Sequence, residues 1–224
     1  MAAGRITNIP PLESGDRLTS SEFERRYQAM SPLKKAELIE GVVYVASPVR
    51  ASRHGIPHAQ IVGWLLVYSA ATPLVDVADN ATVRLDADNQ PQPDALLRLE
   101  PLAGGNSRIS DDDYIEGVPE LIAEIAASSA SYDLNDKLNA YRRNGVREYI
   151  VWQIYENRLD WFYLDNGRYV LLQPDDTGVI HSQIPGLWLA VNALREGDLA
   201  QVLATLQQGL QSAEHQSFVQ QLQS

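Results

Sequence analysis

The most restrictive feature of the sequence is an apolar segment that contains a single carboxylate. Residues 121–127 read Leu-Ile-Ala-Glu-Ile-Ala-Ala, and the acid is Glu124. Continuous apolar runs of this length are typical of strands that are buried on both faces of a sheet. A carboxylate buried in such a strand is strongly destabilising unless a cation or a metal ion pairs with it. The fold must therefore bring a partner for Glu124 from elsewhere in the chain.

The other patterns alternate between helix and strand signals. Ser21 and Glu24 form a capping-box pattern that predicts the start of a helix, and residues 101–113 form a polar loop. Because helices and strands alternate, we expect an α/β fold with a central mixed β-sheet flanked by helices. The predicted helices cover 22–30, 52–71, 133–144 and the segment from 192 onward, and the predicted strands cover 37–41, 42–45, 75–77, 81–85, 94–99, 121–127, 148–154, 158–164 and 168–172.

The composition restricts the class of protein. Of the 224 residues, 45% are hydrophobic, which is typical of a globular chain with one large core. No apolar run reaches the length of a membrane span, and residues 1–16 lack the pattern of a signal peptide. The absence of cysteine excludes disulfides, zinc thiolate sites and a thiol nucleophile. We therefore expect a cytoplasmic protein with no membrane segment.

The net charge of -11 argues against a strong electrostatic grip on nucleic acid. Proteins that bind nucleic acid through its phosphates usually carry a basic surface. An acidic enzyme can still act on a polyanion if its basic residues converge on one cleft, and it then binds its substrate weakly or transiently. The acidity also fits a simple role in solubility.

Asp94 is a second carboxylate at the entry to an apolar strand, in the segment Pro93-Asp94-Ala-Leu-Leu. Two acids on neighbouring strands repel each other, and a divalent cation relieves that repulsion. Oxygen ligands without cysteine favour magnesium or manganese over zinc. Taken alone, however, Asp94 is better explained as the cap of a turn.

Lys137 lies at the margin of the inward-facing stripe of the helix that begins at Asp133. Its ammonium group can reach the strand ends, where it holds an attacking water or stabilises the charge that develops on a phosphate. A metal ion at the same place activates water and binds the leaving oxygen. Taken alone, Lys137 is better explained as an i,i+4 partner of Asp133. The order of acid, acid and helical lysine favours a single catalytic site.

These motifs resemble the Uma-two family of restriction-endonuclease-like proteins, which belongs to the PD-(D/E)XK nuclease superfamily. The resemblance implies a restriction-endonuclease-like fold, in which Asp94 and Glu124 are metal ligands and Lys137 is the catalytic lysine. It also implies an extra acidic residue, Glu37, with Glu40 as the alternative. The superfamily's usual lysine position, two residues after the glutamate, is alanine here. The motifs are Glu37-Leu-Ile-Glu-Gly, Pro93-Asp94, Glu124-Ile-Ala-Ala-Ser, Asp133-x-x-x-Lys137-x-x-x-Tyr141 and Gly145-Val-Arg-Glu-Tyr149.

Two histidines and several arginines are candidates for contact with the substrate. His54 and His58 are four residues apart, and we favour His58 as the residue that contacts phosphate or orients a ligand. The alternative is a solvent-exposed histidine at the start of a helix. Arg53, Arg142 and Arg143 are candidate nucleic-acid contacts, and the alternative is that they are ordinary surface charges.

The sequence therefore predicts a Mg²⁺- (or Mn²⁺-) dependent endonuclease that hydrolyses phosphodiester bonds, with DNA as the substrate. We expect an irregular arm over 1–19, the nuclease domain over 20–195 and a helical tail over 196–224. The apolar face of the tail is expected to pack on the domain or across a homodimer interface. The alternative is a non-catalytic binding module, or one derived from a mobile element, that retains the nuclease fold. A third possibility is action on RNA or on branched structures.

Overall fold

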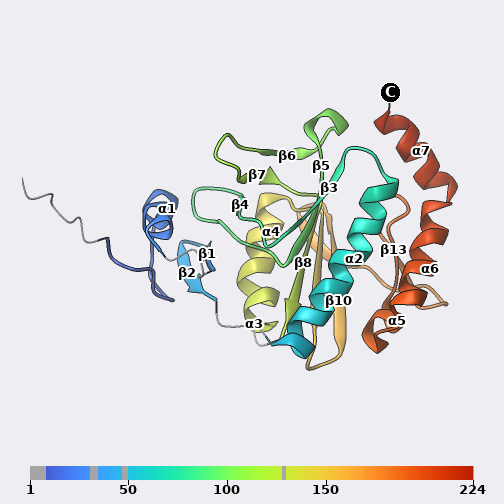
Figure 1. Cartoon of the computed structure of the whole chain (residues 1–224), viewed down its shortest axis with the longest axis horizontal. Coiled ribbons are helices and arrows are strands. Elements are labelled where there is room, and N and C mark those ends of the chain that lie inside the picture. The colour runs from blue at the N-terminus through green and yellow to red at the C-terminus, as the bar shows by residue number, and fades with distance from the viewer. Residues whose placement is uncertain (1–8, 31–34, 47–49, 128–129, 224) are drawn as a thin grey trace, which may run out of the picture.

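The computed structural model has at its centre a six-stranded β-sheet with helices against both faces (Figure 1). One pair of neighbours, β8 and β9, is parallel and the other pairs are antiparallel, so the predicted α/β class with a mixed sheet is confirmed. The structure describes residues 9–30, 35–46, 50–127 and 130–223. In spatial order the strands are β11 (Arg168–Leu171), β10 (Arg158–Asp165), β9 (Glu148–Gln153), β8 (Leu121–Ala126), β5 (Ala95–Leu99) and β3 (Val75–Asp79).

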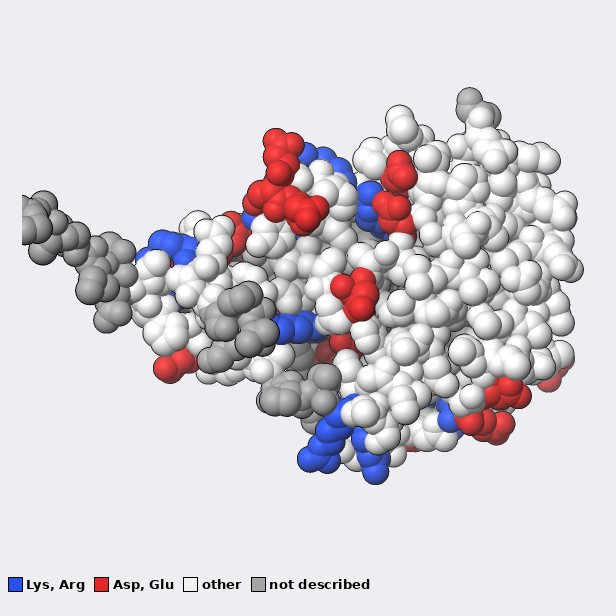
Figure 2. Space-filling view, viewed as in Figure 1, with Lys and Arg blue, Asp and Glu red and all other residues white. Residues whose placement is uncertain are grey.

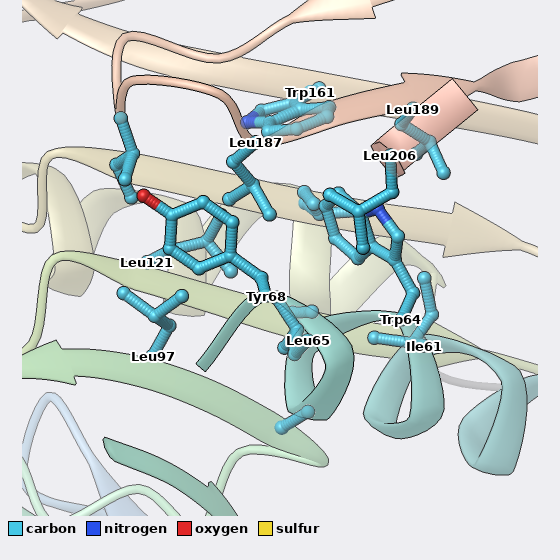
Figure 3. Close-up of a cluster of buried hydrophobic side chains, with 14 of the residues drawn as sticks. Ile61, Trp64, Leu65, Tyr68, Leu97, Leu121, Trp161, Leu187, Leu189 and Leu206 are labelled. Carbon is cyan, nitrogen blue, oxygen red and sulfur yellow. The ribbon is translucent and has the colours of Figure 1, made fainter. Parts of the chain in front are cut away.

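One face of the sheet is covered by α2 (Ile56–Ala71), which follows the π-helical turn η1 (Ala51–Gly55). Together these elements confirm the helix predicted over 52–71. In Figure 3, the α2 side chains Trp64 and Tyr68 pack among side chains from the strands and from the C-terminal segment. This cluster is the larger of the two hydrophobic cores that pack on the central sheet.

The C-terminal helices continue the same layer. The predicted apolar face of the tail packs within the chain, because α6 (Leu199–Leu210) contacts both α2 and β13 (Trp188–Ala190). Its side chains Val202 and Leu206 are fully buried in the core. The remaining helices of the tail are α5 (Val191–Glu196) and α7 (Ala213–Leu222).

The opposite face of the sheet carries a helical run made of three segments. It consists of α3 (Ala130–Tyr132), the π-helical η3 (Asp133–Lys137) and α4 (Leu138–Asn144), which together confirm the helix predicted over 133–144. The run ends at Gly145, whose φ of 87° is the left-handed conformation that glycine adopts most easily. Because side chains alternate along a strand, β8 directs every second residue toward this run.

A separate hairpin packs beside the end of this helical run. It pairs β1 (Ala36–Ile39) with β2 (Val42–Val45) and turns at Glu40-Gly41 as predicted. Helix α1 (Ser20–Gln28) packs on it through the buried Phe23. Residues 1–8 of the predicted arm lie outside the described residues.

Two predictions near the N-terminus and in the polar loop are wrong. Helix α1 is capped by Thr19, whose hydroxyl accepts from the amide of Glu22 at 3.5 Å, and not by Ser21. The proposed box partner Glu24 instead accepts from Arg84 at 2.8 Å, so a tertiary ion pair has replaced the local cap.

The polar loop of residues 101–113 contains unpredicted secondary structure. It holds a short 3₁₀ turn, η2 (Pro101–Ala103), and β6 (Asn106–Ile109), which pairs with β7 (Ile115–Val118). β6 escaped prediction because three of its four residues are polar and three are exposed, and β7 because its four residues show no alternating apolar pattern. The other strands outside the main sheet are β4 (Val83–Arg84) and β12 (Val179–His181). No helix among the described residues is both long and apolar enough to cross a membrane.

Candidate active site

Glu124 lies in the middle of β8 and is 4% exposed, so its carboxylate is buried as the sequence predicts. Its Oε1 accepts hydrogen bonds from Lys137 Nζ at 2.8 Å and from the Tyr141 hydroxyl at 3.0 Å. Both partners come from the helical run, on the face of the sheet toward which Glu124 points. Burial raises the pKa of Glu124, and the negative charge of Asp94 adds to this, whereas Lys137 opposes it. Further positive charge near this carboxylate would therefore stabilise its ionised form.

Lys137 is the cation that the buried strand needs. Its Nζ lies 2.8 Å from Glu124, 3.0 Å from Glu37 and 3.8 Å from Asp133, and the side chain is only 3% exposed. Burial lowers the pKa of Lys137, but the charges of these acids outweigh it and hold that pKa well above its ordinary value. The two interpretations of Lys137 are thus compatible, since it contacts both Asp133 and the strand acid.

Asp94 immediately precedes β5, which runs antiparallel to β8 with Ala95 opposite Ala123. This register places Asp94 beside Glu124, and its Oδ2 accepts from the amide of Ile125 at 2.8 Å. Burial raises the pKa of Asp94, but the hydrogen bond from His54 and nearby positive charge outweigh it, so the pKa lies below its ordinary value. Asp94 is therefore an ionised carboxylate beside Glu124, and together with Glu124, Glu37 and Asp133 it forms what we call the acidic cluster.

Glu37, and not Glu40, joins the cluster from the hairpin. The Oε1 of Glu37 contacts Lys137 and also accepts from the backbone amide of Gln92 at 2.7 Å. Glu40 lies at the hairpin turn and forms an ion pair with Arg143. The structure thus separates the two acids that the sequence left as alternatives.

Both histidines of the i,i+4 pair reach this edge. His58 Nε2 lies 2.6 Å from the carbonyl oxygen of Asp94 and 3.0 Å from Asp79 Oδ1. His54 Nδ1 lies 3.2 Å from the carbonyl oxygen of Ile125, and its Nε2 lies 3.3 Å from Asp94 Oδ1. Since both partners of His54 are acceptors, both ring nitrogens carry hydrogen, which agrees with a pKa that the hydrogen bond to Asp94 raises.

Sequence reasoning missed the contributions of His54, Lys35 and Tyr141. Lys35 Nζ donates to Asn80 at 2.7 Å and lies 3.8 Å from Asp94 Oδ1. No local pattern marks Lys35, because its position depends on how the hairpin docks. The contribution of His54 could have been inferred from the spacing of the two histidines, and that of Tyr141 from the motif that contains it.

The predicted arginine contacts are placed differently. Arg53 is exposed and lies next to His54, with its guanidinium 4.6 Å from the centre of the Tyr155 ring. Arg142 donates to the carbonyl oxygen of Gly167 at 3.0 Å, and Arg143 pairs with Glu40. Arg53 is therefore adjacent in the chain to His54, which contacts Asp94, whereas the partners of Arg142 and Arg143 lie outside the cluster.

The donor set fits a hard divalent cation in its chemistry. Three carboxylates, those of Glu124, Glu37 and Asp133, gather around the ammonium of Lys137, and Asp94 lies beside Glu124. Oxygen donors of this kind suit magnesium or manganese. Within the described residues, however, the side chains as they stand do not form a group of three or more metal ligands. Figure 2 shows one face of the molecule, with acidic side chains at its centre and edges and basic side chains near the centre and along the lower margin.

Comparison with known proteins gives two findings and one absence. A family model named Uma2, with the description "Putative restriction endonuclease", matches residues 20–192. A crystal structure described as "a putative nuclease belonging to DUF820", from Anabaena variabilis, has a TM-score of 0.55 at 12% identity and covers 77% of this chain and 96% of that chain. No curated protein matches the sequence. Since the family model spans most of the chain, this protein belongs to the Uma2 family of restriction-endonuclease-like proteins.

Proposed function

We propose that this protein is a Mg²⁺- (or Mn²⁺-) dependent endonuclease that hydrolyses phosphodiester bonds in DNA. The observation that carries the proposal is the convergence of Asp94, Glu124 and Lys137 from two neighbouring strands and a facing helix. All three side chains are buried, which is costly for a fold unless their charges serve one another or a ligand. A phosphodiester-cleaving site uses this combination of acids and a cation.

The chain's own residues have separate roles in this proposal. Asp94 and Glu124 would hold the metal ion, which when bound supplies an activated water and stabilises the leaving oxygen. Lys137 orients the attacking water or stabilises negative charge on the phosphate. Glu37 positions the Lys137 ammonium and is itself fixed by the amide of Gln92.

The remaining parts of the proposal concern the surroundings of the site. The net charge of -11 supports weak or transient binding of DNA, with Arg53 and His58 as the predicted contacts that lie closest to the cluster. Arg142 and Arg143 would contact nucleic acid only if the substrate extends beyond the cluster. We include a cytoplasmic location and a homodimer, in which each protomer would carry one site. Light scattering at micromolar concentration tests the dimer, and a monomer would remove it.

Plasmid cleavage tests the proposed activity. The purified protein is expected to nick or cut plasmid DNA in the presence of Mg²⁺ or Mn²⁺, and Asp94→Ala is expected to abolish this activity. Asp111→Ala is the matched control, because Asp111 is an exposed carboxylate outside the cluster. Cleavage by the Asp94→Ala protein at the wild-type rate contradicts the assignment of the site.

A non-catalytic module that retains the fold is the second candidate. Two observations favour it: the net charge of -11, and the way Lys137 and Tyr141 already satisfy Glu124 without a metal ion. Titration calorimetry with Mg²⁺ separates the two candidates. An intact fold that binds no metal at millimolar concentration favours the non-catalytic module, whereas saturable binding that Asp94→Ala removes favours the nuclease.

A further inference from the structure

A pocket of about 260 Å³ opens beside the N-terminal end of α2. Its walls come from three places that are distant in the sequence: the η1–α2 junction, the end of β9 and the end of α5. It does not contain the acidic cluster, and the roles assigned above leave it without a function. The lining residues that matter below are Ile56, Gln60, Trp152, Ile154 and Asn157.

The pocket is directly connected to the acidic cluster through one segment. His54 lies in η1, between Ser52 and Ile56, which both line the pocket. It contacts both Asp94 and the carbonyl oxygen of Ile125. Ile125 is paired with Trp152 across the parallel strands β8 and β9. Trp152 and Ile125 pack on the α2 face of the sheet, whereas Glu124 points to the other face. A nucleotide in the pocket would therefore reach a phosphate at the cluster by way of His54 and Asp94.

The lining combines apolar side chains with polar ones, including the charged Arg195 and Glu196, and suits a flat ring system with polar edges. Ile56 is 58% exposed, which is unusual for a large apolar side chain and leaves its surface open to a ligand. Trp152 is buried, yet its Nε1 has no hydrogen-bond partner among the described residues. A buried donor of this kind is destabilising unless an acceptor reaches it. The amide of Gln60 offers a further donor and acceptor on the α2 wall, and the Asn157 amide offers donors, since its Oδ1 already accepts from Arg195 Nε at 3.3 Å.

The surface next to the pocket carries an exposed stack of an arginine on an aromatic ring. Tyr155 is 54% exposed, and the Arg53 guanidinium lies 4.6 Å from its centre. A similar pair exists elsewhere, where Arg84 lies 4.2 Å from the centre of Tyr114. Arg84 is held by acidic partners, whereas Arg53 has none among the described residues. The charge of Arg53 is therefore free to contact a phosphate while Tyr155 offers a face for stacking.

We propose that this pocket and the Arg53–Tyr155 stack together bind one unpaired nucleobase beside the cleaved phosphate. The substrate is then nucleic acid with unpaired nucleotides at the cut, such as a single strand or a branched junction, in preference to a continuous duplex. This inference rests on the proposed nuclease function and names its substrate class. A base must leave its stack to enter such a pocket, and this is easiest where no partner strand holds it.

Binding measurements on the full-length protein test the proposal without the need for cleavage. The probe is a single-stranded oligonucleotide that carries one 2-aminopurine, compared with the same strand in a duplex, both in a buffer without divalent ions. The wild-type protein is expected to bind the single strand more tightly and to quench the 2-aminopurine, because stacking on an aromatic ring quenches it. Tyr155→Ala is expected to weaken single-strand binding by roughly tenfold.

Two further variants make the test specific. Tyr114→Ala removes the comparable ring outside the pocket and is expected to leave single-strand binding unchanged. Trp152→Phe keeps a large aromatic side chain but removes the Nε1 donor, and it is expected to reduce the quenching while thermal unfolding shows an intact fold. Equal affinity for single strand and duplex, or equal effects of Tyr155→Ala and Tyr114→Ala, overturns the proposal.

The outcomes also separate this inference from the proposed function. A protein that cuts plasmid but shows no preference for unpaired nucleotides overturns the pocket's role and leaves the nuclease assignment in place. A protein that binds the single strand through Tyr155 but never cleaves DNA supports the pocket and overturns the nuclease assignment.

Discussion

The ammonium group of Lys137 is the only lysine or arginine charge within 4.0 Å of Glu124 among the described residues. It also contacts Glu37 and Asp133, so its removal leaves three buried carboxylates without their shared counter-ion. Removing one partner from a buried ion pair is strongly destabilising, because the remaining charge is neither hydrated nor paired.

Lys137→Met is therefore expected to abolish cleavage and to lower the free energy of unfolding by about 3–5 kcal/mol. Glu124→Gln is the matched variant, because it removes the acid but leaves Lys137 paired with Glu37 and Asp133. It is expected to abolish cleavage with a much smaller loss of stability. Urea unfolding measures the stability of both variants, and plasmid cleavage measures their activity. A Lys137→Met protein as stable as the wild type would show that the ammonium is not buried among acids.

Glu148 is a second buried carboxylate, and it lies outside the candidate active site. It accepts hydrogen bonds from Trp161 Nε1 at 2.6 Å, from the Ser182 hydroxyl at 2.8 Å and from the Gln183 amide at 2.7 Å. Burial nevertheless raises the pKa of Glu148 from its ordinary 4.5 to about 7. The folded state therefore binds this proton more tightly than the unfolded state does.

The stability that this proton contributes is present below pH 4.5 and is lost as the pH rises to about 7. Glu148→Gln cannot titrate, so the unfolding free energy of the wild type minus that of the variant is expected to fall over this window by up to about 3 kcal/mol. Urea unfolding at a series of pH values measures the difference. Glu13→Gln, at an exposed glutamate, is the control, and a difference that does not vary with pH contradicts the role of Glu148.

Among the helices, α6 packs closely on the segment around β13 at Gly209. A Cβ at Gly209 would overlap the carbonyl oxygen of Gly186 and lie 2.8 Å from Cγ of Trp188. By contrast, a Cβ at Gly63 in α2 would meet nothing within 4 Å. The two helical glycines thus differ in their surroundings and not in their backbone conformation.

Gly209→Ala is expected to lower the free energy of unfolding by about 1–3 kcal/mol, because it forces α6 away from β13. Gly63→Ala is expected to raise it by about 0.5–1 kcal/mol, because alanine loses less backbone entropy in a helix. Thermal or urea unfolding compares the pair. A stabilising Gly209→Ala would mean that α6 does not pack on β13 as described.

The elements that the sequence predicts correctly are those that bury one continuous apolar surface. The strand around Glu124 carries a strong apolar pattern because it lies inside the central sheet, and the helices over 52–71 and 133–144 carry one because they pack against that sheet. The short strands β6, β7, β12 and β13 pair outside that sheet and are only three or four residues long, so none carries an apolar run long enough to mark it. The same reason applies to residues of the site: Glu124 stands out within an apolar run, whereas Lys35 depends on how the hairpin docks.

At the scale of the whole molecule, the acidic surface sets how the protein meets a polyanion. The net charge is -11, and the exposed or partly exposed basic side chains near the cluster are Lys35, Arg50 and Arg53. If all three contact phosphates, the logarithm of the binding constant is expected to fall with the logarithm of salt concentration with a slope of about -3. Arg53→Ala is expected to reduce that slope by about one, as measured by fluorescence anisotropy with labelled DNA. An unchanged slope would place the phosphates elsewhere.

The arrangement of the acids is tested most directly by locating the metal ion itself. A crystal of the full-length protein soaked in Mn²⁺ is expected to show an anomalous difference peak between the carboxylates of Asp94 and Glu124. A peak held by other residues, or no peak there in a crystal whose fold matches the one described, contradicts the account.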